Sequence, residues 1–167
     1  SGQELWAQRY DGPAHGDDVA NALAADGQGN IYVTGYSSGI GTGWDIATIK
    51  YSQAGSQIWV QRYNGAGNGN DAANDIAIDN QGNIYVAGYA SVGTSSWNLD
   101  LIVIKYNSAG AQQWAALYHH AWDGHEIANA MDLDAEGNIV ATGHRNATPP
   151  PPSDYLTVKF NSAGQLE

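Results

Sequence analysis

A repeat of 53 to 55 residues, present three times, constrains this chain more than any other feature. Gly-Asn-Ile-Tyr-Val stands at residues 29–33 and again at 82–86, and Gly-Asn-Ile-Val-Ala follows at 137–141. Other positions recur in the same phase: Trp6, Trp59 and Trp114; Asp45, Asp100 and Asp154; Lys50, Lys105 and Lys159. A period of this size predicts one supersecondary unit per copy, with each unit stacked on its neighbours.

Each copy is predicted to form four short strands. In the first copy they span about residues 19–25, 31–36, 45–51 and 57–63, separated by the turn 26–30, a longer loop at 37–44 and the turn 52–55. Gly and Asn in these turns accept the positive φ that tight hairpins require. No 3.6-residue periodicity points to helices. Four antiparallel strands per copy are typical of a β-propeller blade.

The expected fold is therefore all-β, with three four-stranded antiparallel blades at about residues 17–63, 70–118 and 125–165 of one unit that covers residues 1–167. The first strand of each copy is rich in alanine, and the fourth carries the repeated tryptophan. Small residues on the inner strand and large ones on the outer strand suit a wedge that narrows toward a central channel.

The repeat also resembles a known family. Residues 71–79 (Asp-Ala-Ala-Asn-Asp-Ile-Ala-Ile-Asp), residues 81–89 (Gln-Gly-Asn-Ile-Tyr-Val-Ala-Gly-Tyr), residues 100–105 and the Ala-Gly pair at 109–110 resemble the bacterial beta-propeller repeat family, SBBP. Ala-Gly-x-x-x-Trp is distantly similar to the tryptophan-bearing blades of quinoprotein-type propellers. The resemblance implies a fold but no shared catalytic residues, and a fold does not fix a function.

The two ends of the chain share one phase of the repeat. Residues 1–6 match residues 54–59, and the third copy stops at residues 163–167, where its fourth strand should begin. We expect residues 4–10 to supply that strand to a second copy, which gives a C2 homodimer of six blades, within the 4–8 blades of known propellers. The alternative is a natural or engineered propeller fragment whose only property is assembly.

Charge excludes several classes of partner. The formal net charge is −11, from 17 acidic and 6 basic residues. A nucleic-acid binder needs a basic stripe, and none is present. Anionic membranes are disfavoured for the same reason, and no apolar run approaches the roughly 20 residues of a spanning helix. We expect neither nucleic acid nor membrane as a partner. The compartment stays open; the family resemblance and the acidic composition suggest an extracellular or periplasmic bacterial protein.

Candidate binding residues gather on the predicted face that carries the longer loops. Asp18, Asp71 and Glu126 each begin an inner strand, so a six-bladed ring would hold six carboxylates near its channel. Such a ring could bind a cation or a polyol. Alternatively, these acids cap turn amides or pair with the repeated lysines.

Aromatic residues and histidines give a second set of candidates. Trp44, Trp97 and Trp122 are predicted in long loops, where they either stack on a sugar or pin the loop to a neighbouring blade. His125 lies beside Glu126, with His119 and His120 close in sequence. No metal-ligand spacing such as HExxH occurs, so the sequence predicts no metal site and no cofactor.

Three functions remain open from sequence. The first is a non-catalytic propeller scaffold or binding module that takes a protein or glycan on its long-loop face. The second is assembly alone, as a fragment. The third is a hydrolase or lyase with His125, Glu126 and neighbouring acids in the channel. No GxSxG, P-loop or GxGxxG motif is found in a suitable context, which favours a protein that is not an enzyme.

Overall fold

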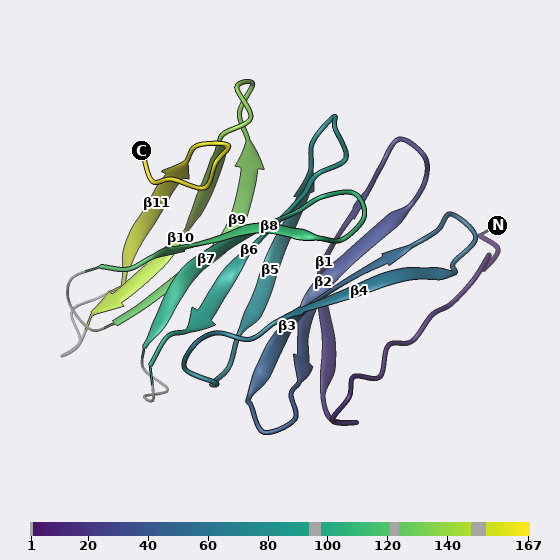
Figure 1. Cartoon of the computed structure of the whole chain (residues 1–167), viewed down its shortest axis with the longest axis horizontal. Coiled ribbons are helices and arrows are strands. Elements are labelled where there is room, and N and C mark those ends of the chain that lie inside the picture. Colours follow the sequence, from purple (N-terminus) through teal and green to yellow (C-terminus); the bar gives the residue numbers. More distant parts are fainter. Residues whose placement is uncertain (1, 94–97, 121–123, 148–152) are drawn as a thin grey trace.

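The computed structural model describes residues 2–93, 98–120, 124–147 and 153–167, and these ranges contain strands and loops without a helix (Figure 1). It follows that no helix in the described ranges is suited to cross a bilayer. The strands are β1 (Asp18–Ala25), β2 (Ile31–Ser38), β3 (Trp44–Tyr51), β4 (Gln57–Tyr63), β5 (Ala72–Ile78), β6 (Ile84–Ser91), β7 (Leu99–Tyr106), β8 (Gln112–Tyr118), β9 (Gly124–Leu133), β10 (Ile139–Ala147) and β11 (Asp154–Phe160).

The strands form three groups that follow the sequence repeats. The first repeat is a sheet in the order β1-β2-β3-β4, and the second pairs β5 to β8 in the same manner. The third contains β9, β10 and β11, and one parallel bridge between Leu99 and His125 links it to the second. The groups stand side by side, with the first repeat and the N-terminus on the right and the third repeat and the C-terminus on the left (Figure 1). The all-β antiparallel architecture expected from the sequence is confirmed.

The hydrophobic core lies in two layers between the repeats. β7 contributes side chains to both layers, because successive side chains of a strand point to opposite faces of the sheet. Ile102 and Ile104 belong to the layer shared with the first repeat, and Leu101 and Val103 belong to the layer shared with the third. All four side chains are completely buried. The second repeat is therefore apolar on both faces, as a sheet packed between two others must be.

The inner strands are joined by repeated asparagines. A register shift occurs beside Asn21 in β1 and beside Asn74 in β5, which is the signature of a β-bulge. The Asn21 side chain donates to the Ala73 carbonyl at 2.8 Å, and the Asn74 side chain donates to the Ala128 carbonyl at 2.8 Å. Each bulge thus connects one repeat to the next.

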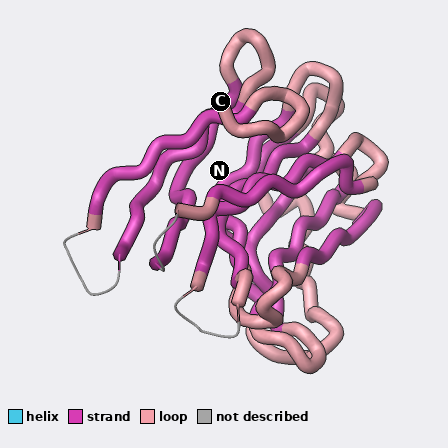
Figure 2. Tube along the Cα trace, turned by 60° about the vertical axis from the view of Figure 1, so that its left-hand side comes forward, coloured by secondary structure: helices cyan, strands magenta, loops and turns pink. Residues whose placement is uncertain are grey.

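Turns gather at both ends of the strands (Figure 2). At one end, the β5–β6 turn is closed by Asp79, whose carboxylate accepts the amides of Gln81 and Asn83, while Gly82 takes a φ of 78°. Residues 26–30 and 134–138 form the same hairpin turn. At the other end the longer loops contact one another, since the Gly43 amide donates to the Asn68 carbonyl. The predicted separation of short turns from long loops is therefore observed.

Candidate functional site

Asp71 lies at the start of the inner strand of the second repeat and is completely buried. Its two carboxylate oxygens accept the amides of Gly65 and Ser91, each at 2.6 Å. Burial raises the pKa of Asp71 to about 6; the two amides oppose this shift, and the nearby Asp45 adds to it. In the first repeat Asp18 has a similar role, because its carboxylate accepts the Gly12 amide at 3.0 Å.

Glu126 occupies the equivalent position in the third repeat, and it is 1% exposed. Burial, and then the negative charge of Asp100, raise the pKa of Glu126, while Arg145, His119 and the His120 amide lower it. The Arg145 Nε lies 3.5 Å from its Oε1.

The three acids do not pair with the repeated lysines in the described residues. Lys50 lies over the Tyr32 ring at 5.0 Å from its centre, and Lys105 over the Tyr85 ring at 5.1 Å. Lys159 pairs with Asp134 and Glu167. Of the two structural roles predicted for these acids, amide capping is the one the geometry favours for Asp18 and Asp71.

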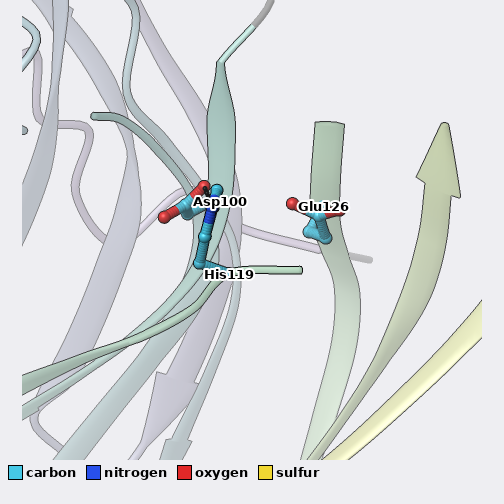
Figure 3. A group of neighbouring side chains, drawn as sticks. All are labelled: Asp100, His119 and Glu126. Carbon is cyan, nitrogen blue, oxygen red and sulfur yellow. Dashed lines mark hydrogen bonds and ion pairs between the residues drawn. The ribbon is translucent and has the colours of Figure 1, made fainter. Parts of the chain in front are cut away.

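A second row of acids was not assigned a binding role from sequence. Asp45 pairs with Arg62 (Nη2 to Oδ2, 2.8 Å), and its counterpart Asp100 pairs with His119 (Nδ1 to Oδ1, 3.0 Å). Figure 3 shows Asp100 and His119 together, with Glu126 on the facing strand. Both junctions between repeats therefore hold an acid pair: Asp45 with Asp71, and Asp100 with Glu126.

The aromatic candidates are only partly covered by the structure. Trp44 is the first residue of β3 rather than a loop residue, and its ring stacks on Tyr36 with centroids 4.3 Å apart. Trp97 and Trp122 lie outside the described residues. His125 pairs with Asn146 in the β9–β10 ladder, and burial followed by the neighbouring His144 lowers its pKa. Sugar binding by these residues stays a prediction.

The outward face of the first repeat is an apolar surface that is covered only in part, since Tyr51 on it is buried beside Trp6 whereas Val19 is exposed. A groove of about 210 Å³ there is lined by residues that include Trp6, Val19, Tyr36 and Tyr51. Ala20 is exposed on this face, whereas its counterparts Ala73 and Ala128 are 0% exposed, because a preceding repeat covers them. This face has the chemistry of an interior junction.

The outward face of the third repeat is also covered only in part. The hydroxyls of Thr142 and Thr157 bond at 3.1 Å in an exposed position, while the same pair in the first repeat, Thr34 and Thr48, is buried beneath the second. Tyr155 on β11 is 100% exposed. Among the described residues, the outer edge of β11 is paired only by the single bridge between Phe160 and Leu166.

The repeated tryptophans reveal where the N-terminal segment lies. Trp59 packs on Gly110 of the next repeat, and Trp114 packs on Gly164; a Cβ on either glycine would come within 2.9 Å of the indole. Trp6 packs on Gly55 in the same manner, and its Nε1 donates to the Gln53 carbonyl at 3.2 Å. Trp6 thus sits against the first repeat as if residues 6–10 were the outer strand of a repeat that precedes it.

The backbone of this segment is nevertheless unpaired. Residues 2–17 form no strand, and residues 2–10 make no backbone–backbone hydrogen bond within the described part of the chain. Tyr10 is held through its hydroxyl, which accepts from Arg62 at 3.2 Å. The pairing of residues 4–10 with a second copy stays a prediction.

Sequence reasoning missed two of these features. The asparagines that join the inner strands recur at residues 21, 74 and 129, but the sequence alone assigns them no role. The contact of each repeated tryptophan with a turn glycine of the next repeat was also missed, although the tryptophan and the glycine both recur in every copy. A residue repeated in all units at an unvarying position is the signal that could have identified both contacts.

Comparisons with known proteins agree with this architecture. Residues 9–41 and 58–93 match the family model described as the beta-propeller repeat, SBBP, so the resemblance inferred from sequence is confirmed for these segments. A crystal structure of a protein of unknown function from Bacteroides caccae superposes with a TM-score of 0.50 at 13% identity. The match covers 89% of this chain but 44% of that one, and it concerns the fold alone. None of the curated proteins matches.

Proposed function

We propose that this chain, two segments of which match the beta-propeller repeat, is a non-catalytic propeller scaffold that binds a second copy of itself to form a six-bladed ring. Each repeat is then one blade. The third blade of each copy receives residues 6–10 of the other copy as its outer strand.

The position of Trp6 carries this proposal. Trp59 and Trp114 each belong to the outer strand of one blade and pack on the glycine of the next. Trp6 makes that contact with Gly55, although no blade precedes it within the chain. The simplest source of the missing blade is a second copy, because the third blade of this chain has an open edge at β11.

The pairing inside the chain specifies the register. Lys50 lies opposite Trp59 and Ile46 opposite Tyr63 in the β3–β4 ladder. The same alignment places Lys159 opposite Trp6 of the other copy, and Tyr155 opposite Tyr10. The β11 edge and the backbone of residues 2–10 both have unused hydrogen-bonding groups. A ladder between them would satisfy these groups, which need partners once they are buried.

The blade faces are complementary in the same way. Asn129 occupies the position of Asn21 and Asn74, but in the described chain its side chain lies 3.4 Å from the His144 Nδ1 instead of on a neighbouring carbonyl. In the ring it would donate to the Ala20 carbonyl of the other copy. Val19 and Leu23, which are exposed, would be covered by the third blade. Two copies of three blades give six, within the range of 4–8 that closes propellers.

Engineered cysteines test the register directly, since the chain has none of its own. Directly paired residues of antiparallel strands have Cα atoms about 4.5–5.5 Å apart, which suits a disulfide. The double variant Tyr10→Cys with Tyr155→Cys should form a covalent dimer under mild oxidation, visible by non-reducing electrophoresis.

The control combines Tyr155→Cys with Gln113→Cys, which places the second thiol on the exposed outer strand of the second repeat, away from the proposed contact, and should leave the chains separate. A ladder of higher oligomers in the Tyr10→Cys/Tyr155→Cys variant would contradict a closed ring and favour an open array. The absence of any covalent dimer would contradict the pairing itself.

The loop end of the blades is where we place a further protein or glycan ligand. The hairpin turns at the opposite end share one sequence pattern in all three repeats, whereas residues 37–44, 91–99 and 145–153 differ from one another. Variable loops on a constant frame are typical of a binding surface. A glycan array probed with the protein and with Trp44→Ala tests this proposal; no binding to any glycan would remove the sugar ligand and leave the protein ligand.

A further inference from the structure

The junction between the second and third repeats holds three side chains whose donor atoms converge. Asp100 comes from β7, His119 follows β8, and Glu126 comes from β9 (Figure 3). One donor atom from each lies within 4.8 Å of the others. β7 pairs with β8 on one side and meets β9 through the parallel bridge between Leu99 and His125, which brings the three residues together.

The equivalent junction between the first and second repeats shows what such a pair of acids needs. There Arg62 binds Asp45 at 2.8 Å, and the amides of Gly65 and Ser91 satisfy both oxygens of Asp71. Two carboxylates are thus compensated by one guanidinium and two strong amide donors. Buried carboxylates are stable only with such partners.

The second junction has weaker compensation, from the Arg145 Nε at 3.5 Å and from the His120 amide. Leu117 occupies the position of Arg62, and His119 occupies the position of Asn64. Glu126 is 1% exposed, and its carboxylate oxygens make no hydrogen bond of standard geometry, although the His120 amide lies close enough to lower its pKa. The Arg145 Nε lies 3.5 Å from the Glu126 Oε1 and makes no hydrogen bond of standard geometry with it. A buried carboxylate with unused acceptor capacity therefore faces a carboxylate and an imidazole.

We propose that Asp100, His119 and Glu126 bind one divalent transition-metal ion, and that Zn²⁺ fits this donor set best. An imidazole nitrogen with two carboxylate oxygens suits zinc, whose bonds to such atoms are about 2.0–2.2 Å and whose catalytic or open sites keep a fourth position for water. Calcium is disfavoured because it takes six to eight oxygen ligands. Nδ1 of His119 and Oδ1 of Asp100 lie 3.0 Å apart and share one proton. The bound ion takes the place of that proton.

The site also has a structural consequence for the molecule. Asp100 and His119 belong to the second repeat and Glu126 to the third, so a bound ion would tie two blades together at the loop end. At the first junction other bonds make this link: the Asp71 amide donates to the Trp44 carbonyl, and the Trp44 amide donates to the Asn70 side chain. All three metal-binding residues belong to one chain, so metal binding does not depend on the ring assembly. If the metal site is wrong, the ring proposal is unaffected, and the reverse also holds.

Calorimetric titration of the chelator-treated protein with Zn²⁺ tests the site. We expect one ion per chain, and an affinity at least about tenfold lower in His119→Asn, the residue that the first junction carries at this position. Glu126→Gln should lower the affinity similarly. His119 is partly exposed, so the His119→Asn variant remains informative if Glu126→Gln does not fold.

The matched control is His15→Asn, which removes an exposed histidine that also pairs with an acid, Asp11, at 2.9 Å. Its zinc affinity should equal that of the unaltered chain. Equal affinities in the unaltered chain and His119→Asn would overturn the proposal, as would a loss confined to His15→Asn or a titration without binding.

Discussion

At the scale of single residues, burial decides the chemistry of the acids that begin each inner strand. Asp71 is buried beside Asp45, and this raises its pKa to about 6 although two amides stabilise the charge. Asp79 has the opposite balance, because hydrogen bonds from Asn83, Gln81 and Tyr85 outweigh burial and lower its pKa overall. As the pH rises, Asp71 therefore lowers the stability of the folded state, whereas Asp79 raises it.

The Asp71→Asn variant tests the raised value. The folded pKa of about 6 lies above the unfolded value of 3.8, so the folded state holds the proton more tightly and its stability falls as the pH rises through that window. One pKa unit corresponds to about 1.4 kcal/mol, so the loss is about 3 kcal/mol. The unfolding free energy of Asp71→Asn, relative to the unaltered chain, should rise by that amount from pH 4 to about pH 7.

Urea denaturation at a series of pH values measures this difference. Asp17→Asn, a change at an exposed acid, is the control and should show no comparable slope. A difference between Asp71→Asn and the unaltered chain that does not vary with pH would contradict the raised pKa.

Gly88 is a second position at which a single added carbon atom, Cβ, should destabilise the fold. It lies opposite the bulge of β5, and a Cβ there would come 2.0 Å from the Ala72 carbonyl oxygen. Since the obstacle is backbone, Gly88→Ala should lower the unfolding free energy by about 2–3 kcal/mol, as overpacked sites do. Gly27→Ala, with no atom within 4 Å of its new Cβ, is the control for chemical denaturation. Equal stability of the two variants would contradict the close approach.

At the scale of elements, the connection between repeats depends on inner-strand asparagines. The Asn74 side chain donates to the Ala128 carbonyl, so Asn74→Ala leaves that carbonyl without its partner. A loss of about 1–2 kcal/mol in unfolding free energy should follow. Asn80→Ala, in an exposed turn, should change stability little. An unaltered stability of Asn74→Ala would show that the bond adds nothing to the junction.

The elements themselves were predictable, and their junctions were not. Strands such as Gln57–Tyr63 follow from local signals, namely alternating apolar residues between Gly-Asn turns, repeated in each copy. The cluster of Asp100, His119 and Glu126 depends on how two sheets are stacked, which no local pattern encodes. The loss of the arginine at the position of Leu117 has meaning only once Arg62 is seen beside Asp45.

At the scale of the whole molecule, the outward faces of the first and third repeats resemble the faces that pack together inside the chain, but they are covered only in part. Ala20 and the Thr142–Thr157 pair are exposed, while their counterparts within the chain are buried. Trp6 holds residues 2–10 in the position of an outer strand, and β11 has an unpaired edge. The proposed ring would give both ends of the stack the same contact that joins the repeats inside it.

The molar mass in solution, by sedimentation equilibrium over a range of concentrations, tests this central claim most directly. The account predicts twice the 17.7 kDa of one chain for the unaltered protein. Asn129→Ala should weaken the dimer, because it removes the proposed donor to Ala20 of the other copy. A mass of 17.7 kDa in a folded sample at all concentrations would contradict the six-bladed ring.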